Sequence, residues 1–278
     1  RPNDLFQFLL ARPATAPAMQ LGLNGPVMLA GAECASGAIT IDRGAKTLLP
    51  FRGDRLPDAD VMVVGGTDAP LATGNIRFFE AVGEAVDTTD DITVASRPFH
   101  RSASGLVMGE GAGALVLETW AHAKKRGLTE EDILAELVGY DSRTDAKSKV
   151  QAGVRGAKLI LENALQMSHL QPNERVYINA HATSTAVGDK IEASVYQNEL
   201  PGLGVDMKML DVTSTKSATG HTMGAAGAIE AVFTIMAVKE DSVPPPQKLE
   251  LSEAIEEIQN LDPRRHQNPS NEPVALGV

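Results

Sequence analysis

The sequence has few aromatic residues and a single cysteine. Aromatic residues make up 4% of the 278 residues, so a core has to be built from Val, Leu, Ile, Ala and Met. One cysteine, Cys34, excludes an internal disulfide and fits a reducing compartment. No run approaches the roughly eighteen apolar residues of a membrane-spanning helix, and no signal peptide is visible. We therefore expect a soluble, cytoplasmic chain without membrane insertion; an organellar compartment is the alternative.

Basic residues and metal-ligand patterns are also scarce. The sequence contains 25 Lys and Arg residues and 36 Asp and Glu residues, which gives a net charge of −11. Nucleic acids and anionic membranes both require a basic surface, so neither is an expected partner. The sequence has no H-x-x-x-H or C-x-x-C spacing, so no metal site is predicted. At 43% apolar and 22% charged residues, the chain has ample core for one large domain.

Strand-like and helix-like segments alternate along the chain. Apolar runs between turn residues predict strands at 27–29, 61–64 (ended by a Gly-Gly turn), 114–118, 135–141 and 176–181. Helical spacing or small-residue content predicts two helices that begin near Cys34 and near residue 188. It also predicts helices at 120–127, 152–167 and 224–240, and the helix at 224–240 should be buried on nearly every face. Segment 84–99 is polar and predicted to be an exposed loop. The alternation implies an α/β fold in one domain, built from a duplicated unit.

Cys34 has a setting that favours a reactive thiol. A predicted strand ends shortly before it, and small residues open a predicted helix directly behind the sulfur. The unpaired N–H groups and the dipole at a helix N-terminus lower the pKa of a thiol and make it a nucleophile. Glu33 argues the other way, because a neighbouring carboxylate raises a thiol pKa. A lone cysteine is also commonly an inert core residue, so both interpretations stay open at this point.

Lys216 and His221 stand five residues apart in "TSTKSATGHTMGAAG", which runs from Thr213 to Gly227. The Gly and Ala residues allow tight packing against another backbone. A lysine just ahead of such a segment is costly unless it has a partner or a task. The alternative is a polar start to a buried helix. His181 ends a predicted strand and begins a Thr/Ser loop, whereas the four remaining histidines lie in polar surroundings typical of a surface.

One cysteine at a helix start, two histidines and one lysine predict a Cys–His constellation of the nucleophilic type. The segments "ECASG", "NAHATST" and "TKSATGHTMGAAG" resemble the beta-ketoacyl-[acyl carrier protein] synthases, which are elongating condensing enzymes of the thiolase superfamily. "VMVVGGTDAP", "ASRPF" and "LVMGEGAGALVLE" fall between them in the order of that family. The resemblance covers roughly residues 21–249.

The resemblance implies a five-layered α/β/α/β/α thiolase-like fold with two pseudo-symmetric halves in one ketosynthase domain, 1–278. The half at about 1–140 would carry Cys34, and the half at about 141–278 the histidines and the lysine. It also implies a homodimer, acyl carrier protein as partner, and no cofactor beyond the phosphopantetheine of that partner. Cys34 would take an acyl chain as a thioester, and decarboxylated malonyl-acyl carrier protein would attack it. The product would be 3-oxoacyl-acyl carrier protein in fatty acid synthesis.

The resemblance also implies residue roles. His181 and His221 would donate hydrogen bonds to the oxygen on which negative charge develops, with Lys216 holding charge near His181. Glu192, eleven residues after His181, matches a family glutamate that supports the lysine. The threonines expected to hydrogen-bond the phosphopantetheine arm are Thr183 and Thr185.

The sequence departs from the family pattern in several places. It opens without an initiator Met, and we expect the N-terminal part of the family core and a C-terminal glycine-rich loop to be missing. The missing parts predict sheets with absent strands or exposed apolar faces. Glu33 and Ala182 replace small residues usual in the family, and Ala103 replaces a carrier-docking arginine. The alternatives are therefore a catalytically impaired or non-catalytic ketosynthase-like partner subunit, a polyketide ketosynthase, or a fragment of a larger enzyme.

Overall fold

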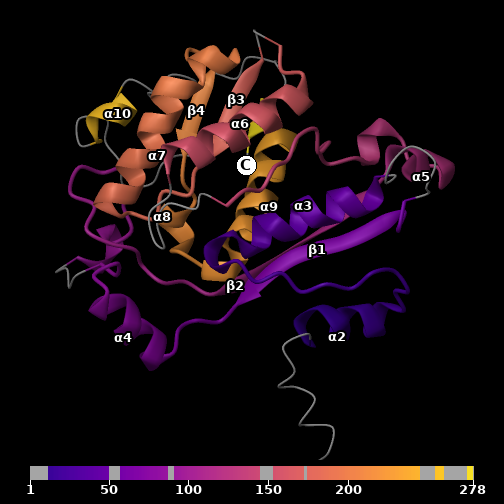
Figure 1. The fold of residues 1–278 in the computed structure, drawn as a ribbon, viewed down its shortest axis with the longest axis horizontal. Helices are drawn as coiled ribbons and strands as arrows, with labels where there is room; N and C mark the ends of the chain where they lie inside the picture. The colour runs from indigo at the N-terminus through magenta and orange to yellow at the C-terminus, as the bar shows by residue number, and fades with distance from the viewer. Residues whose placement is uncertain are drawn as a thin grey trace, which may run out of the picture. The chain divides into compact units, whose positions relative to one another are not determined.

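Helices and strands alternate along the chain, as the sequence predicts for an α/β protein (Figure 1). The computed structural model describes residues 12–49, 57–86, 91–144, 153–171, 174–244, 254–259 and 274–277. It divides into two compact units, each assembled from separate stretches of the chain. The first draws on residues up to Asp68, on Gly111–Ile133 and on Gly224–Ile229, and the second on the remainder.

The first unit is a two-stranded antiparallel ribbon with a helix along it. Strand β1 (Val61–Asp68) pairs with β2 (Gly111–Glu118), with Val63 opposite Val116. Helix α3 (Ser36–Leu48) packs on β1, and a Cβ on Gly44 would lie only 2.3 Å from Val64 Cγ1. The other elements of this unit are α2 (Arg12–Leu21), η2 (Glu33–Ala35), α5 (Trp120–Lys125) and η4 (Glu130–Asp132).

Gly65 and Gly66 do not end the strand, contrary to the predicted turn. Strand β1 continues through both of them to Asp68. A Cβ on Gly65 would lie 2.4 Å from the carbonyl oxygen of Gly113, and one on Gly66 would lie 2.7 Å from that of Gly224. These glycines therefore serve close backbone approach rather than chain reversal.

The Gly and Ala residues around 224–228 pack tightly, as the sequence predicts. Helix α9 (Ala226–Lys239) begins in the first unit with residues 226–229 and continues in the second. At its start, a Cβ on Gly227 would lie 2.7 Å from the amide nitrogen of Ala38, and one on Gly37 would lie 2.5 Å from that of Ala228. No larger residue fits at either glycine without moving backbone, so the first turns of α3 and α9 are held in direct contact.

The second unit is built on a three-stranded parallel sheet in the order β4–β3–β5. The central strand β3 (Arg175–Asn179) is buried along its whole length, between β4 (Leu210–Thr213) and β5 (Val274–Gly277). Its core contains, among others, Phe99, Val176, Ile178, Tyr196, Leu200, Leu210, Val212 and Ile258. The other elements are α4 (Thr73–Ala81), η3 (Ile92–Val94), α6 (Val154–Ser168), α7 (Ala186–Glu199), η5 (Pro201–Leu203), α8 (Lys216–Thr219) and α10 (Glu256–Gln259), with η6 (Met223–Ala225) spanning the boundary.

Two predicted strands do not form. Residues 27–29 have no regular secondary structure and are about half exposed. A strand needs a hydrogen-bonded neighbour, and among the described strands β1 and β2 pair only with each other. Residues 135–141 have no regular secondary structure and run along α6, where a Cβ on Gly139 would lie 2.2 Å from the carbonyl oxygen of Ala164. Apolar composition predicts burial but does not reveal whether a pairing partner exists.

The predicted loop 84–99 and the predicted buried helix are each confirmed only in part. Asp91–Thr93 is exposed, but Ser96 and Phe99 are buried, and residues 87–90 lie outside the described part. Helix α9 is buried over its first turns, yet Phe233 and Met236 are exposed further along. In the described part of the chain, no helix is both long and apolar enough to cross a membrane.

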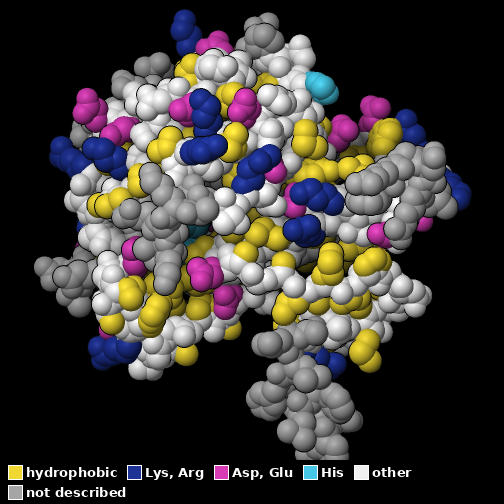
Figure 2. Space-filling model, in the orientation of Figure 1, with side chains coloured by type: hydrophobic (Ala, Val, Ile, Leu, Met, Phe, Trp, Pro, Cys, Tyr) yellow, Lys and Arg dark blue, Asp and Glu magenta, His cyan; other side chains and the backbone are white. Residues whose placement is uncertain are grey.

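Apolar side chains are exposed on the outer face of the β1–β2 ribbon, as the sequence predicts. Val63 and Val116, which face each other across the strands, are 41% and 68% exposed, whereas Val64 on the inner face is 6% exposed. Hydrophobic side chains gather around β1 and α2 on the face seen in Figure 2. The ribbon thus buries one face against α3 and leaves the other to solvent.

The two faces predict unequal responses to the same substitution. Val64→Thr places a hydroxyl in the packed inner face, and we expect it to lower the free energy of unfolding by about 1–3 kcal/mol. Val63→Thr keeps the β-branched shape on the exposed face and should change stability by less than about 0.5 kcal/mol. Urea unfolding followed by circular dichroism measures both. Equal losses would contradict the assignment of inner and outer faces.

Candidate active site

The polar residues of the second unit converge where two parallel strands end. Neighbouring parallel strands β3 and β4 place their carboxyl ends at one edge of the sheet. Asn179 lies opposite Thr213 there, and the Ala180 amide donates to the Thr213 carbonyl at 2.7 Å. His181 follows β3 by two residues, and Lys216 follows β4 by three. Sequence positions 35 residues apart are therefore brought together by the sheet register.

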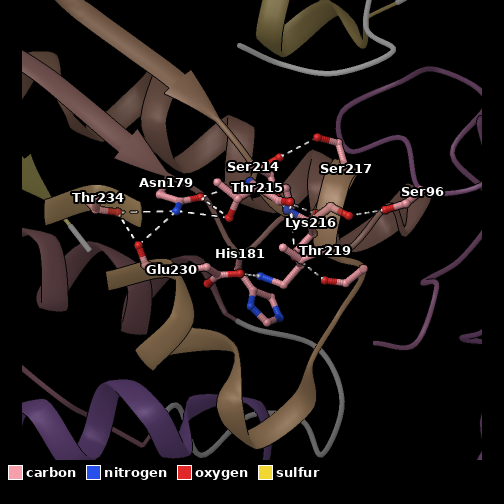
Figure 3. A network of polar contacts seen from close by, with 12 residues as sticks. Ser96, Asn179, His181, Ser214, Thr215, Lys216, Ser217, Thr219, Glu230 and Thr234 are labelled. Carbon is pink, nitrogen blue, oxygen red and sulfur yellow. Dashed lines mark hydrogen bonds and ion pairs between the residues drawn. The ribbon is translucent and has the colours of Figure 1, made fainter. Parts of the chain in front are cut away.

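Lys216 is buried and forms an ion pair with Glu230 of α9. The lysine is 1% exposed and the glutamate 8% exposed, and the Lys216 ammonium contacts Glu230 Oε1 (Figure 3). Burial raises the pKa of Glu230, and the charge of Lys216 opposes that rise. A buried ammonium without a partner is strongly unfavourable, so the pair satisfies the requirement that the sequence places on Lys216.

Glu230 was not predicted from the sequence, although it has a signal there. It is the only charged residue between Ala226 and Val238, a stretch in which Thr234 is the only other polar side chain. A lone carboxylate in such a helix has to meet a cation or a hydrogen-bond donor when it is buried. That pattern, set beside a buried lysine, would have predicted the pair.

Asn179 ties the strand end to the lysine loop and to α9. Its Nδ2 lies 3.3 Å from Thr215 Oγ1, 3.3 Å from the Glu230 carbonyl and 3.4 Å from Thr234 Oγ1. Its Oδ1 accepts from the Thr215 amide at 3.2 Å. Ser96, which lies far from these residues in the sequence, also contributes: its hydroxyl donates to the Lys216 carbonyl at 2.6 Å. The backbone that carries Lys216 is thus fixed from several sides (Figure 3).

The two histidines lie edge to face beside this network. The ring centroids of His181 and His221 are 5.2 Å apart and the ring planes are at 90°. His221 is buried, and its backbone is held by residues 107–109: its amide donates to the Val107 carbonyl at 2.7 Å, and its carbonyl accepts from the Gly109 amide at 2.9 Å. His181 retains solvent-accessible surface and lies near Lys216 (Figure 3).

Both imidazoles are held neutral. Burial, with a further contribution from the charge of Lys216, lowers the pKa of His221 to about 3. Dense surrounding protein, the charge of Lys216 and the neighbouring His221 ring lower the pKa of His181 well below its usual value. A neutral imidazole carries one N–H donor and one acceptor nitrogen. The pair therefore offers two N–H donors, with a positive charge nearby that strengthens their attraction for a developing oxyanion.

Glu192 does not take the role predicted for it. In the hydrogen bonds described for it, its Oε1 accepts from the His181 amide at 2.8 Å and its Oε2 from the Ala182 amide at 2.7 Å. The Tyr196 hydroxyl also donates to it, at 2.5 Å. Glu230, which lies in α9, pairs with the lysine instead. The spacing from His181 correctly predicted that Glu192 lies near the site. In its described bonds, however, the Glu192 carboxylate accepts from the backbone amides at His181 and Ala182, and the ammonium of Lys216 pairs with Glu230.

The threonine loop after His181 is anchored by a buried carboxylate. Thr183 and Thr185 lie with their hydroxyl oxygens 3.1 Å apart. Asp189, 1% exposed, accepts from the Thr185 amide at 3.2 Å and from the Phe99 amide at 2.7 Å. Burial raises the pKa of Asp189 to about 7. These bonds explain why the end of segment 84–99 is buried: it is fastened to the loop that carries both threonines.

Cys34 belongs to the first unit. It lies in η2, the single turn that leads into α3, and its residue is half-buried. The predicted position of the thiol at a helix start is confirmed. In the second unit, the structure thus brings together His181, Lys216, His221, Glu192, Thr183 and Thr185. Cys34 lies in the first unit.

Comparisons with known proteins agree with the predicted family and fold. The models for the beta-ketoacyl synthase N-terminal and C-terminal domains match residues 11–123 and 134–250. A 3-oxoacyl-[acyl-carrier-protein] synthase 2 from Staphylococcus aureus is 40% identical over 230 residues, which is 82% of this chain and 52% of that protein. A mitochondrial 3-oxoacyl-[acyl-carrier-protein] synthase from Arabidopsis thaliana is 39% identical, over 81% of this chain and 48% of that protein.

Solved structures give the same result. A type II polyketide ketosynthase in complex with its acyl-carrier protein matches with a TM-score of 0.78 at 30% identity, covering 88% of this chain and 58% of that one. A beta-ketoacyl synthase from Burkholderia phymatum matches with a TM-score of 0.73 at 31% identity, covering 84% and 53%. The fold is therefore of the thiolase-like α/β class that ketosynthases share.

Within that class, the chain belongs to the beta-ketoacyl synthase family. It spans about half the length of the curated relatives it matches. The division into halves near residue 140, the roles of the individual site residues and the homodimer remain predictions.

The buried ion pair predicts a large stability difference between two glutamates. Glu230→Gln leaves the Lys216 ammonium buried without its carboxylate, and we expect a loss of about 3–5 kcal/mol in the free energy of unfolding. Glu199→Gln breaks the more exposed Lys158–Glu199 pair, whose atoms are 2.6 Å apart, and should cost at most about 1 kcal/mol. Equal losses in urea unfolding would show that the Lys216–Glu230 pair is not sealed from solvent.

The lowered pKa of His221 predicts a pH-dependent stability. Between about pH 6.5 and pH 3 the unfolded chain binds a proton at this histidine and the folded chain does not. Its contribution is therefore complete above pH 6.5 and is lost as the pH falls, by up to about 1.4 kcal/mol per pH unit. His221→Gln should reduce this slope in urea unfolding by the share of one histidine and leave the share of His181, whereas the exposed His169→Gln should leave the slope unchanged. A slope that His221→Gln does not reduce would contradict the assignment.

Proposed function

We propose that the protein takes part in decarboxylative condensation, joining an acyl chain held on Cys34 to malonyl-acyl carrier protein. The product is 3-oxoacyl-acyl carrier protein in fatty acid synthesis. The observation that carries the proposal is the pair of neutral imidazoles beside a buried lysine, a pairing that suits stabilisation of a thioester oxyanion or enolate. The family membership and the 3-oxoacyl-[acyl-carrier-protein] synthase relatives support the same chemistry.

The first half-reaction is thioester exchange on the cysteine. The Cys34 thiolate attacks the carbonyl carbon of the acyl-acyl carrier protein, the carbon–sulfur bond to phosphopantetheine breaks, and the released thiolate takes up the proton that Cys34 lost. The acyl chain is then a thioester of Cys34. The chain's only cysteine leaves no competing thiol for this role.

The second half-reaction makes the carbon–carbon bond. Malonyl-acyl carrier protein loses carbon dioxide, and the electron pair of the broken bond forms an enolate. The enolate oxygen accepts hydrogen bonds from the ring N–H groups of His181 and His221. The enolate carbon attacks the Cys34 thioester, the Cys34 sulfur leaves as thiolate, and the 3-oxoacyl product stays on the carrier. Burial, with the charge of Lys216, keeps both imidazoles neutral, and each neutral ring still offers one N–H donor.

Other residues bind and position. Thr183 and Thr185 hydrogen-bond the phosphopantetheine arm, and Glu192 holds the backbone of His181 in place. No further cofactor is part of the proposal. The chain functions as a homodimer with acyl carrier protein as partner, in the cytoplasm or in an organelle, as the mitochondrial relative illustrates. A polyketide substrate is the second candidate, because one of the similar solved structures is a polyketide ketosynthase in complex with its acyl-carrier protein.

The two half-reactions should respond differently to loss of one histidine. His221→Ala removes one of the two N–H donors, so decarboxylation of malonyl-acyl carrier protein should fall about a hundred- to a thousand-fold. Acyl loading of Cys34 depends mainly on the thiol and should fall far less. Loading is followed by intact mass, with Cys34→Ala as the unreactive control, and decarboxylation by release of carbon dioxide. No loading of the wild-type chain would favour a non-catalytic partner subunit, and equal loss of both steps would overturn the assignment of His221.

A further inference from the structure

The backbone immediately before Cys34 adopts a conformation that needs support. Glu33 has a φ of 51°, in the left-handed region that residues with a Cβ rarely occupy. It is a glutamate rather than the glycine or asparagine that tolerates this region best. The peptide group between residues 33 and 34 sets the direction in which the Cys34 side chain leaves the backbone. Whatever holds Glu33 in this conformation therefore also orients the thiol.

The Ser36 hydroxyl binds the backbone on both sides of Glu33. It donates to the Glu33 carbonyl at 2.6 Å and accepts from the Ala32 amide at 2.9 Å. The Ser36 amide donates to the same Glu33 carbonyl. One side chain thus closes a five-residue loop in which Cys34 is the third residue. None of these bonds involves the sulfur itself.

The geometry points to Ser36 as a positioning residue for the nucleophile: its hydroxyl locks Glu33 in the left-handed conformation and so fixes the direction of the Cys34 thiol at the start of α3. This inference rests on the proposed role of Cys34. It goes beyond that role, because it assigns a task to a residue that takes no part in the steps of the proposed reaction.

Thr40 on the same helix provides a matched control. Its hydroxyl lies 2.7 Å from the Gly37 carbonyl and 2.9 Å from the Gly65 carbonyl, so it also binds backbone within the first unit. It makes no described bond to residues 32–36. Loss of either hydroxyl removes side-chain hydrogen bonds from α3, but only Ser36 acts on the loop that contains Cys34.

The test measures the alkylation of Cys34, which is the only cysteine in the chain. The 278-residue chain is treated with iodoacetamide from about pH 6 to about pH 9, a range that spans the usual thiol pKa of about 8.5, and modification is followed by intact mass. Ser36→Ala should slow alkylation about ten-fold and move the pH profile upward, because the thiolate loses its fixed place before the amides of α3. Thr40→Ala should stay within about two-fold of the wild type, and Ser36→Thr, which keeps the hydroxyl, should retain the wild-type profile.

A second substitution tests the mechanism rather than the residue alone. Glycine adopts a φ of 51° without a steric penalty, so Glu33→Gly should restore most of the rate lost in Ser36→Ala. Equal rates in Ser36→Ala and Thr40→Ala would overturn the inference, and so would a double variant no faster than Ser36→Ala. If Ser36→Ala fails to fold by circular dichroism, the double variant is compared with Thr40→Ala instead, and a double variant alkylated about ten-fold more slowly than Thr40→Ala would overturn the inference.

The outcome is separable from that of the proposed function. Iodoacetamide needs no carrier protein and no histidine, so its rate reports the thiol alone. A chain that shows the Ser36 effect but takes no acyl group from acyl-acyl carrier protein would overturn the proposed function and leave the positioning role intact. If Ser36→Ala and the wild type load acyl groups equally well and are alkylated equally fast, the positioning role is overturned and the proposed function stands.

Discussion

The ion pair between Lys216 and Glu230 is the interaction on which the site depends. Burying an ammonium requires a carboxylate, and α9 supplies one in an otherwise apolar stretch. With that partner, a positive charge persists beside two imidazoles, of which His221 is buried and His181 is exposed. Desolvation by the surrounding protein and the field of Lys216 lower the pKa of both histidines, so each ring is held neutral with one N–H donor and one acceptor nitrogen. Stability and chemistry are therefore coupled at the same pair of residues.

Close backbone packing is the second constraint. Glycines at 37, 66 and 227 let the start of α9, the start of α3 and strand β1 approach within distances that a Cβ would forbid. The same packing in the first unit fixes the turn that presents Cys34. In the second unit, hydrogen bonds that Asn179 and Asp189 accept and that Ser96 donates hold the loops that carry Lys216 and the threonines.

The sequence was sufficient for residues whose identity and spacing carry chemistry. The positions of Cys34, His181, Lys216 and His221 relative to helix starts and strand ends followed from local patterns and from the family resemblance. Glu230 was missed because the partner of a buried lysine depends on which helix meets the strand ends in space. The strand expected at 27–29 failed for a related reason: its composition suits a strand, but no partner for it lies in the described part of the chain.

The central claim is that both imidazoles are neutral donors at physiological pH. It is tested most directly by NMR of the chain with isotope-labelled histidine rings, titrated from about pH 8 to about pH 5, with His181→Gln and His221→Gln used to assign the signals. These two rings should keep the chemical shifts of neutral imidazole throughout the titration. A protonation midpoint near pH 6.5 for either His181 or His221 would contradict it.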